Sequence, residues 1–196
     1  MTMATTSRAL LHRVRDPEDG EAWARFHELY APLILGYARA HGLGHVDAEE
    51  IRDHCMAIVA RKVPAFEYEE RRGGFKAWLY RIAKGAIIDQ LRRPSVRRAE
   101  TAELGALVDV QPSPDELWEQ HWRDEHLRFC LDEVKQTENE RTFQVFEMLL
   151  FEGAPVETVC ARLDLNANQV YKAKSRVLAR VRAVMKRLGD DADERA

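Results

Sequence analysis

The sequence contains few of the residues that mark disulfide-bonded or membrane-spanning proteins. It has 3 cysteines, 10 glycines and 7 prolines in 196 residues, and no window approaches eighteen consecutive apolar residues. The cysteines, at positions 55, 130 and 160, are odd in number and far apart, which excludes a disulfide framework and a CxxC site. Residues 1–7 lack the apolar core of a signal peptide. We therefore expect a cytoplasmic protein without a transmembrane span.

The chain also lacks segments in which apolar and polar residues alternate, as they would in half-buried strands. Apolar residues recur mostly at steps of three and four, and the hydrophobic content of 45% is enough for ordinary cores. This pattern predicts an all-α protein made of two small helical domains joined by a linker, the C-terminal one containing a helix-turn-helix.

Signatures of catalysis and of metal binding are missing as well. There is no glycine-rich phosphate loop and no recognisable pair of nucleophile and base. His126 with Cys130, and His54 with Cys55, do not form a zinc pattern and are expected to pack in helices. We expect no enzyme, no cofactor, no metal and no catalytic residues.

Charge is present in both signs but is segregated along the chain. Residues 71–98 carry nine basic residues against Asp89 alone, whereas residues 100–157 carry fifteen acidic and four basic residues. Residues 166–188 carry seven basic residues and no acidic one. Two basic blocks around an acidic middle indicate two separate contacts with a polyanion.

The second basic block lies in a predicted helix-turn-helix between Gly153 and Arg187. A first helix begins after Pro155, and residues 164–166 make a very short break in which Asp164 takes the place of the usual glycine. Asn166 is a good N-cap for the second helix. The outward face of that helix combines amides, which can read bases, with cations, which hold phosphates. We expect it to bind DNA through Asn168, Gln169, Lys172, Lys174, Ser175, Arg176 and Arg180.

The first basic block follows an aromatic loop and forms a helix over residues 75–93, which Pro94 ends. Its apolar residues form one face and its cations the other, so it can follow a phosphate backbone. The loop before it, at 63–74, carries two aromatic rings, which can anchor in the core or hold an unpaired base. The candidate DNA-binding residues here are Phe66, Tyr68, Lys76, Tyr80, Arg81, Lys84, Arg92 and Arg93.

A preceding helix, at residues 47–62, has a polar outward face. Asp47 and Glu50 have the spacing of a capping box at its start. Its exposed charges can be simple solvent cover or a docking surface for a partner protein, and periodicity does not decide between them.

Four parts of the chain follow from these patterns. We predict a first domain at residues 7–94, with Ser7 capping its first helix, and a linker at 95–112, where the apolar period is lost. A second domain at 113–188 begins with Ser113 and Pro114, which have the signature of a helix start. Residues 189–196 form an acidic tail.

Both halves resemble sigma factors of the extracytoplasmic-function group in the bacterial sigma-70 family. The N-terminal half resembles sigma domain 2, through FHELY at 26–30, DAEEI at 47–51, FKAWLYRIA at 75–83 and IDQLRR at 88–93. The C-terminal half resembles sigma domain 4, through FEG at 151–153, the helix-turn-helix, and VYKAKSRVL at 170–178. Lys84-Gly85 stands where the family commonly has Arg-Asn, and Asp53-His54 where it commonly has Gln-Glu.

The resemblance implies a factor that docks on core RNA polymerase and directs it to promoters without doing chemistry itself. Helix 166–186 would then enter the major groove at minus-35, and the loop and helix at 64–93 would read the minus-10 element. Asp47, Glu49, Glu50 and Asp53 would face the polymerase. Its partners would be core RNA polymerase and promoter DNA, and the free protein would be a monomer; whether an anti-sigma factor also binds stays open.

A conventional helix-turn-helix regulator that binds duplex DNA without polymerase is the main alternative. The cationic face on helix 75–93 argues against it, because a sensor or dimerisation domain has no use for nine cations on one stretch. No heptad pattern that would pair two half-sites is present either.

Overall fold

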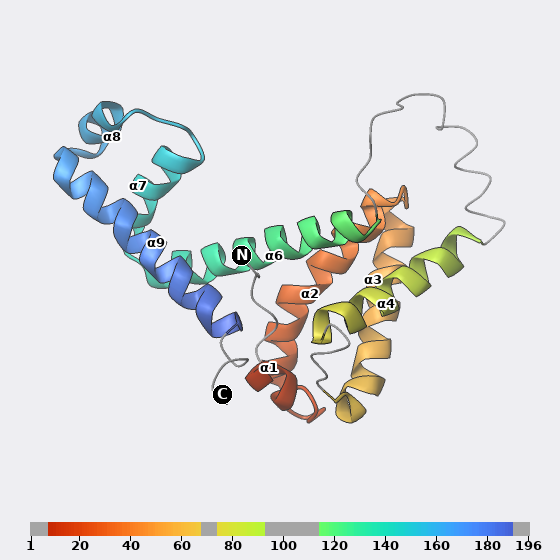
Figure 1. Ribbon diagram of the computed structural model, residues 1–196. Coiled ribbons are helices and arrows are strands. Elements are labelled where there is room, and N and C mark those ends of the chain that lie inside the picture. Colours follow the sequence, from red (N-terminus) through yellow and green to blue (C-terminus); the bar gives the residue numbers. More distant parts are fainter. Residues whose placement is uncertain (1–7, 68–73, 93–113, 190–196) are drawn as a thin grey trace, which may run out of the picture. The chain divides into compact units, whose positions relative to one another are not determined.

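The computed structural model describes residues 8–67, 74–92 and 114–189 (Figure 1). Within these ranges the chain forms α-helices and one 3-10 turn, with no strand, which confirms the predicted all-α class. The helices are α1 (Arg8–Arg13), α2 (Gly20–Ala40), α3 (His45–Lys62), α4 (Gly74–Leu91), α6 (Pro114–Thr137), α7 (Glu140–Leu150), α8 (Val156–Leu163) and α9 (Ala167–Gly189), and the 3-10 turn is η1 (Val63–Ala65).

The chain divides into two compact units, and the division falls inside α6. Among the described residues, those up to Glu125, together with Gly189, form unit 1, and residues 126–188 form unit 2. The sequence predicts a boundary at residue 112, with the whole of α6 in the second domain. The linker at 95–112 and residues 190–196 of the acidic tail lie outside the described part of the chain.

The predicted capping box at the start of α3 is wrong. The helix begins two residues earlier, at His45, with Gly44 as an N-cap that makes no side-chain hydrogen bond. The Asp47 carboxylate instead accepts a hydrogen bond of 2.9 Å from the Gln90 side chain of α4. The Asp47 carboxylate therefore binds a residue of another helix and does not cap its own helix. The predicted caps Ser7 and Ser113 lie beyond the described residues.

The start of α7 is marked by a polar side chain and not by a proline or a glycine. The helix begins at Glu140, because the Asn139 side chain accepts hydrogen bonds from the Arg141 and Thr142 amides and caps the helix there.

Aromatic rings from α2 and α4 form the centre of unit 1. Phe26, Tyr30 and Phe75 are fully buried, with ring centroids 4.6 to 5.8 Å apart. The buried side of α3, with Cys55 and Val59, also belongs to this core. This packing fixes α4 with its cationic residues on the opposite side of the helix.

The first half of α6 packs in unit 1 as well (Figure 1). Trp118 is 3% exposed and Trp122 is 1% exposed. Their ring centroids lie 5.0 Å from Tyr37 and 5.6 Å from Tyr30, respectively. Two tryptophans one helical turn apart thus pack the first half of α6 against the aromatic side of α2.

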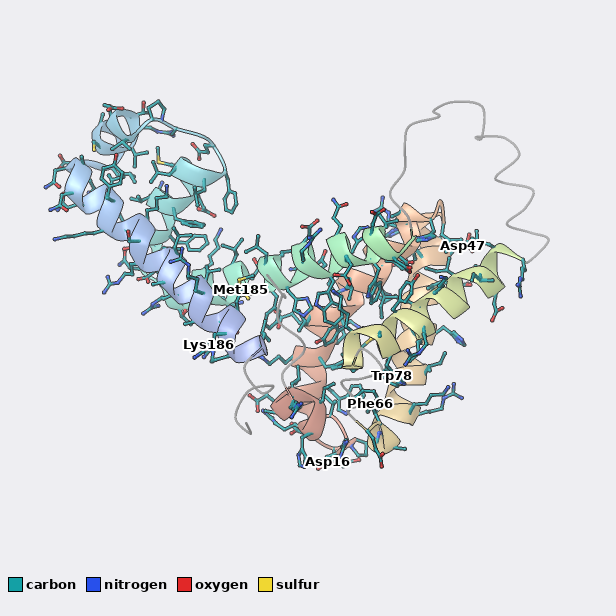
Figure 2. All side chains as sticks on the ribbon, viewed as in Figure 1. Asp16, Asp47, Phe66, Trp78, Met185 and Lys186 are labelled. Carbon is teal, nitrogen blue, oxygen red and sulfur yellow. The ribbon has the colours of Figure 1, made fainter. Side chains whose placement is uncertain are left out.

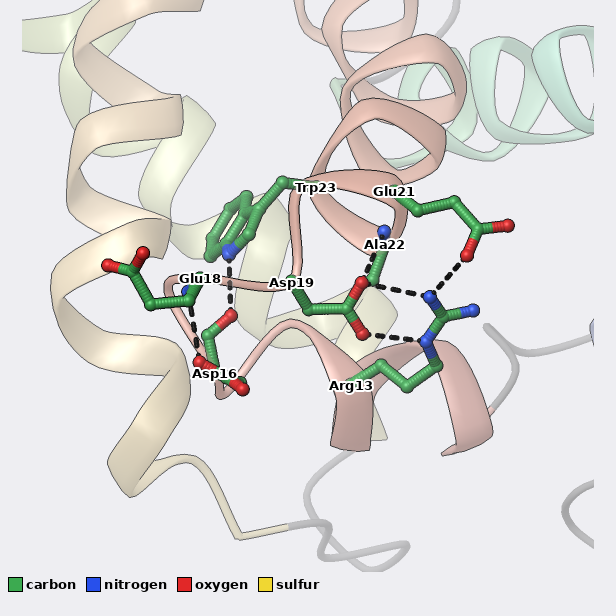
Figure 3. Close-up of polar contacts among 7 residues, drawn as sticks. All are labelled: Arg13, Asp16, Glu18, Asp19, Glu21, Ala22 and Trp23. Atoms are coloured by element: carbon green, nitrogen blue, oxygen red, sulfur yellow. Dashed lines mark hydrogen bonds and ion pairs between the residues drawn. The ribbon is translucent and has the colours of Figure 1, made fainter.

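A network of charges joins α1 to the start of α2 (Figure 3). The Arg13 guanidinium donates two hydrogen bonds of 2.8 Å to the Asp19 carboxylate and a third of 2.8 Å to Glu21. Asp19 is also the N-cap of α2, where it accepts from the Ala22 amide at 3.0 Å. Arg13 and, to a smaller extent, this amide hold the pKa of Asp19 below its ordinary value of 3.8.

This shift predicts how stability depends on pH. A carboxyl whose pKa is lower in the folded chain stabilises the fold above its unfolded pKa, and that contribution is lost as the pH falls through the folded value. We expect the stability difference between the wild type and Asp19→Asn to be full above about pH 4 and to shrink at lower pH. Thermal melts from pH 7 to pH 2 measure it, and parallel curves for the two proteins would contradict it.

One core cluster of unit 2 lies where α7, α8 and α9 meet. Val145, Met148, Val159 and Val170 are its fully buried members, and partly buried Cys160, Leu163 and Leu165 pack against them. Further along α9, Val177 and Val181 are buried as well and form an apolar stripe with Val170. The stripe directs the polar face of α9 to solvent.

Candidate nucleic-acid interface

The turn between α8 and α9 has the geometry that the sequence predicts. Asp164 has φ 48° and ψ 59°, so it takes the left-handed conformation in which glycine is more usual. The Leu165 amide then donates to the Cys160 carbonyl at 3.0 Å, and Leu165 packs on the core. The turn therefore orients α9 rigidly relative to α8.

A reciprocal pair of hydrogen bonds begins α9. The Gln169 amide donates to the Asn166 side-chain oxygen at 2.9 Å, and the Asn166 amide donates to the Gln169 side-chain oxygen at 2.8 Å. The predicted N-cap is confirmed, and Gln169 completes a capping box. Its oxygen is engaged in the cap, which leaves the side-chain NH₂ group to donate to an acceptor on DNA.

The remaining candidate residues of α9 differ in exposure. Lys174 is half-buried, and the Arg180 guanidinium forms an ion pair of 3.1 Å with Glu138 and donates to the Thr137 carbonyl at 3.1 Å. Arg180 is thus engaged within unit 2. The residues that are exposed along the first turns are Asn168, Gln169, Lys172, Ser175 and Arg176.

A groove of about 370 Å³ runs beside these turns, and one of the cationic side chains that line it is not among the residues predicted from the sequence. Arg141, at the start of α7, lines it together with Lys172 and Arg176. The Arg141 guanidinium also donates to the carbonyls of Leu163 and Asp164, so it supports the turn. Arg141 lies in the acidic part of the sequence, so the distribution of charge along the chain does not indicate that it lies beside the basic helix α9.

In unit 1, the cationic face of α4 is partly exposed and partly covered. Arg81, Lys84 and Arg92 are exposed. The Lys84 ammonium lies 5.1 Å from the centre of the Tyr80 ring, and Arg92 lies 3.9 Å from Asp89 in a weak surface pair. Among the other candidates, Tyr68 and Arg93 lie outside the described residues.

Two candidates on α4 contact α6. The Lys76 ammonium pairs with the Glu119 carboxylate, and the Tyr80 hydroxyl donates to the Asp115 carboxylate. Partial burial, followed by the hydrogen bond to Asp115, raises the pKa of Tyr80. The structure thus brings acidic residues of α6 onto a face that the sequence assigns to DNA.

Phe66, at the start of the aromatic loop, packs against the core of unit 1. Figure 2 shows Phe66 beside Trp78, and their ring centroids are 4.8 Å apart. Phe66 is half-buried, and its carbonyl accepts a hydrogen bond of 2.5 Å from Arg15. The anchored alternative therefore describes Phe66, although part of its ring stays accessible.

A groove between α3 and α4 adjoins Trp78. Its volume is about 340 Å³, and its polar or charged lining residues are His54, Lys62, Arg81 and Asp89. A Cβ added at Gly85, which also lines the groove, would meet nothing within 4 Å. The groove is therefore open at position 85.

The four residues assigned to the polymerase lie on or beside the polar face of α3. Glu49 pairs with His45 at 3.6 Å and with Arg52 at 3.5 Å. Asp53 pairs with Arg52 at 2.8 Å, and this contact holds the pKa of Asp53 below its ordinary value. Their side chains are 40% and 66% exposed, so both can reach a partner. Glu50 is exposed, and Asp47 is bonded to Gln90.

Other kinds of site find little support in the described residues. No group of three or more His, Cys, Asp or Glu side chains there is placed to hold a metal ion. Burial raises the pKa of the Cys55 thiol to about 12, which makes it unreactive. Over the same residues, no helix has the length and the apolar character needed to cross a membrane.

Comparison with known proteins shows similarity to a family model and to a characterised relative. Residues 26–97 match the family model for sigma-70 region 2, which covers α3, α4 and most of α2. The chain is also 25% identical over 174 residues to the ECF RNA polymerase sigma factor RpoE of Cereibacter sphaeroides. That match covers 85% of this chain and 94% of the relative, so it includes both helical units.

Proposed function

We propose that this chain is a sigma factor of the extracytoplasmic-function group in the sigma-70 family, in which each helical unit supplies one promoter contact and α3 docks on core polymerase. The observation that supports this assignment is the presence of a separate cationic helix face in each unit. Unit 2 presents Lys172 and Arg176 on α9, and unit 1 presents Arg81 and Lys84 on α4. A regulator that binds duplex DNA through a helix-turn-helix alone has no need of the second face.

For the minus-35 element, the first turns of α9 enter the major groove. The amides of Asn168 and Gln169 face the bases, and Lys172 and Arg176 hold the phosphates. Arg141 adds a third cation at the groove beside them. Because the capping box and the left-handed turn fix the start of α9, the helix is oriented relative to α8 before DNA binds.

For the minus-10 element, α4 follows the backbone with Arg81, Lys84 and Arg92. Melting a promoter costs base stacking, and holding an unpaired base offsets part of that cost. The groove beside Trp78, Arg81 and Gly85 has the aromatic wall, the cation and the open space that an extruded base requires.

The protein itself does no chemistry in this proposal; it acts in the cytoplasm, where polymerase and promoter are found. As a free protein it is a monomer. An anti-sigma factor, if one regulates it, would have to cover α3 or one of the two cationic faces to keep it inactive.

Docking can be tested directly with the purified full chain and core polymerase. We expect the two to elute from gel filtration as a one-to-one complex. Separate elution at micromolar concentrations, combined with tight binding of the free chain to duplex DNA, would contradict the proposal.

The polymerase-facing role of α3 leads to a specific prediction. Replacing Glu49 and Asp53 by lysine reverses two exposed charges and should weaken the complex by about tenfold or more, because like charges across an interface repel. The fold should change little, since exposed ion pairs such as those with Arg52 contribute about 0–1 kcal/mol.

A matched control reverses two exposed acids outside this face, Glu18 and Glu28. Co-purification with tagged core polymerase, quantified against the wild type, measures both variants. Equal retention of the Glu49→Lys/Asp53→Lys chain and the control chain would remove α3 from the docking surface.

A further inference from the structure

The first turns of α6 bring acidic side chains to one end of the α4 face. Asp115 accepts a hydrogen bond from the Tyr80 hydroxyl, and Glu119, one turn later, pairs with the Lys76 ammonium. Tyr80 and Lys76 are themselves one turn apart on α4. The contacts therefore form two matched rungs between neighbouring helices of unit 1 (Figure 1).

Apolar packing holds the acids in this position. Trp118 and Trp122 alternate with them along α6 and are almost fully buried against α2. The helices approach closely at Gly36, where an added Cβ would lie 3.2 Å from the His121 ring. The position of Asp115 and Glu119 therefore depends on a packed interface and not only on their surface charges.

This arrangement changes what Lys76 can bind. The Lys76 side chain is 20% exposed, and its ammonium is paired with Glu119. The same Nζ atom lies 5.4 Å from the centre of the Trp122 ring. A phosphate that approached Lys76 would have to replace the carboxylate. Arg81, Lys84 and Arg92 are exposed by contrast, so the restriction applies to one end of α4.

We propose that the first turns of α6 are an autoinhibitory contact, in which Asp115 and Glu119 mask the Lys76 and Tyr80 end of α4 from DNA. The inference rests on the proposed function of α4 in promoter binding. The free factor then has low affinity for single-stranded DNA, because carboxylates and phosphates compete for the same ammonium and hydroxyl groups. Neutralising the carboxylates frees these groups and leaves the tryptophan packing in place.

The test uses the full chain and a fluorescein-labelled single-stranded 20-mer of mixed sequence, with binding followed by polarisation. Asp115→Asn/Glu119→Gln should bind about five- to tenfold more tightly than the wild type at low salt. The apparent affinity rises because a larger fraction of the protein has Lys76 and Tyr80 free to bind DNA. One additional free cation should also steepen the salt dependence by about 0.7 in log–log slope.

The control variant is Glu28→Gln/Asp124→Asn. It removes two negative charges from exposed side chains of unit 1, one of them on α6. The single variant Glu119→Gln, which keeps the hydrogen bond between Asp115 and Tyr80, should give an intermediate gain. Circular dichroism checks that every variant is folded.

Equal binding by the Asp115→Asn/Glu119→Gln chain and the control chain would overturn the inference, as would absence of any gain in Glu119→Gln. Gel filtration of the same chains with core polymerase separates this failure from a failure of the proposed function. A wild type that binds polymerase while the variants show no gain refutes only the mask. A wild type that does not bind polymerase refutes the sigma-factor function itself.

Discussion

Replacing both Lys172 and Arg176 by alanine should weaken binding to duplex promoter DNA by about ten- to hundredfold at 100 mM salt. Each charge-assisted contact with a phosphate contributes about 1.5–3 kcal/mol at most, and part of that is recovered by solvation. Losing two phosphate contacts should also reduce the slope of log affinity against log salt by about 2. Both residues are exposed in the first turns of α9, so unit 2 should stay folded.

The matched control removes two cations further along the same helix, Arg182 and Lys186, which are also exposed. The net charge changes by the same amount, but these residues lie beyond the turns expected to enter the groove. Titrations of labelled duplex promoter at several salt concentrations compare the two variants. An unchanged slope in Lys172→Ala/Arg176→Ala would show that α9 does not bind phosphates there.

The second large effect concerns stability. Trp122→Ala should lower the free energy of unfolding of unit 1 by about 3–5 kcal/mol, because the ring is 1% exposed and leaves a cavity beside Tyr30. Small domains have about 5–15 kcal/mol in total, so the variant should melt at a far lower temperature.

Ile88→Ala serves as the control, since Ile88 also lies in unit 1 and is 38% exposed. Urea unfolding followed by circular dichroism gives both values. A loss for Trp122→Ala no larger than that for Ile88→Ala would mean that the first half of α6 does not pack in unit 1.

Helices of strong amphipathic character could be predicted from the sequence, and so could the helix-turn-helix. The stripe of Val170, Val177 and Val181 and the left-handed Asp164 depend on neighbours within a few residues. Local periodicity and turn chemistry are sufficient for such features. The cap at Asn166 is predictable for the same reason.

Features that depend on residues far apart in the chain could not be predicted. Asp47 has the spacing of a cap but binds Gln90, 43 positions away. Lys76 has the position of a DNA ligand but pairs with Glu119, also 43 positions away. Arg141 supports a turn more than twenty residues later. A single sequence carries no signal for such pairs, because nothing within a few residues of either partner marks the contact.

The placement of α6 shows the same limit. Its start at Pro114 is plain from the sequence, but nothing local indicates that Trp118 and Trp122 pack on α2 and not on α7. Two tryptophans with helical spacing predict an apolar stripe, and the choice of the surface that the stripe covers is made by the fold as a whole.

The most direct test is run-off transcription with purified core polymerase and this chain on a library of bacterial promoter fragments. We expect start sites that core polymerase alone does not use, with a minus-10 and a minus-35 element upstream of each, and loss of those transcripts with Lys172→Ala/Arg176→Ala. Transcripts identical to those of core polymerase alone, together with tight binding of the isolated chain to duplex DNA, would contradict the account and point to a conventional helix-turn-helix regulator.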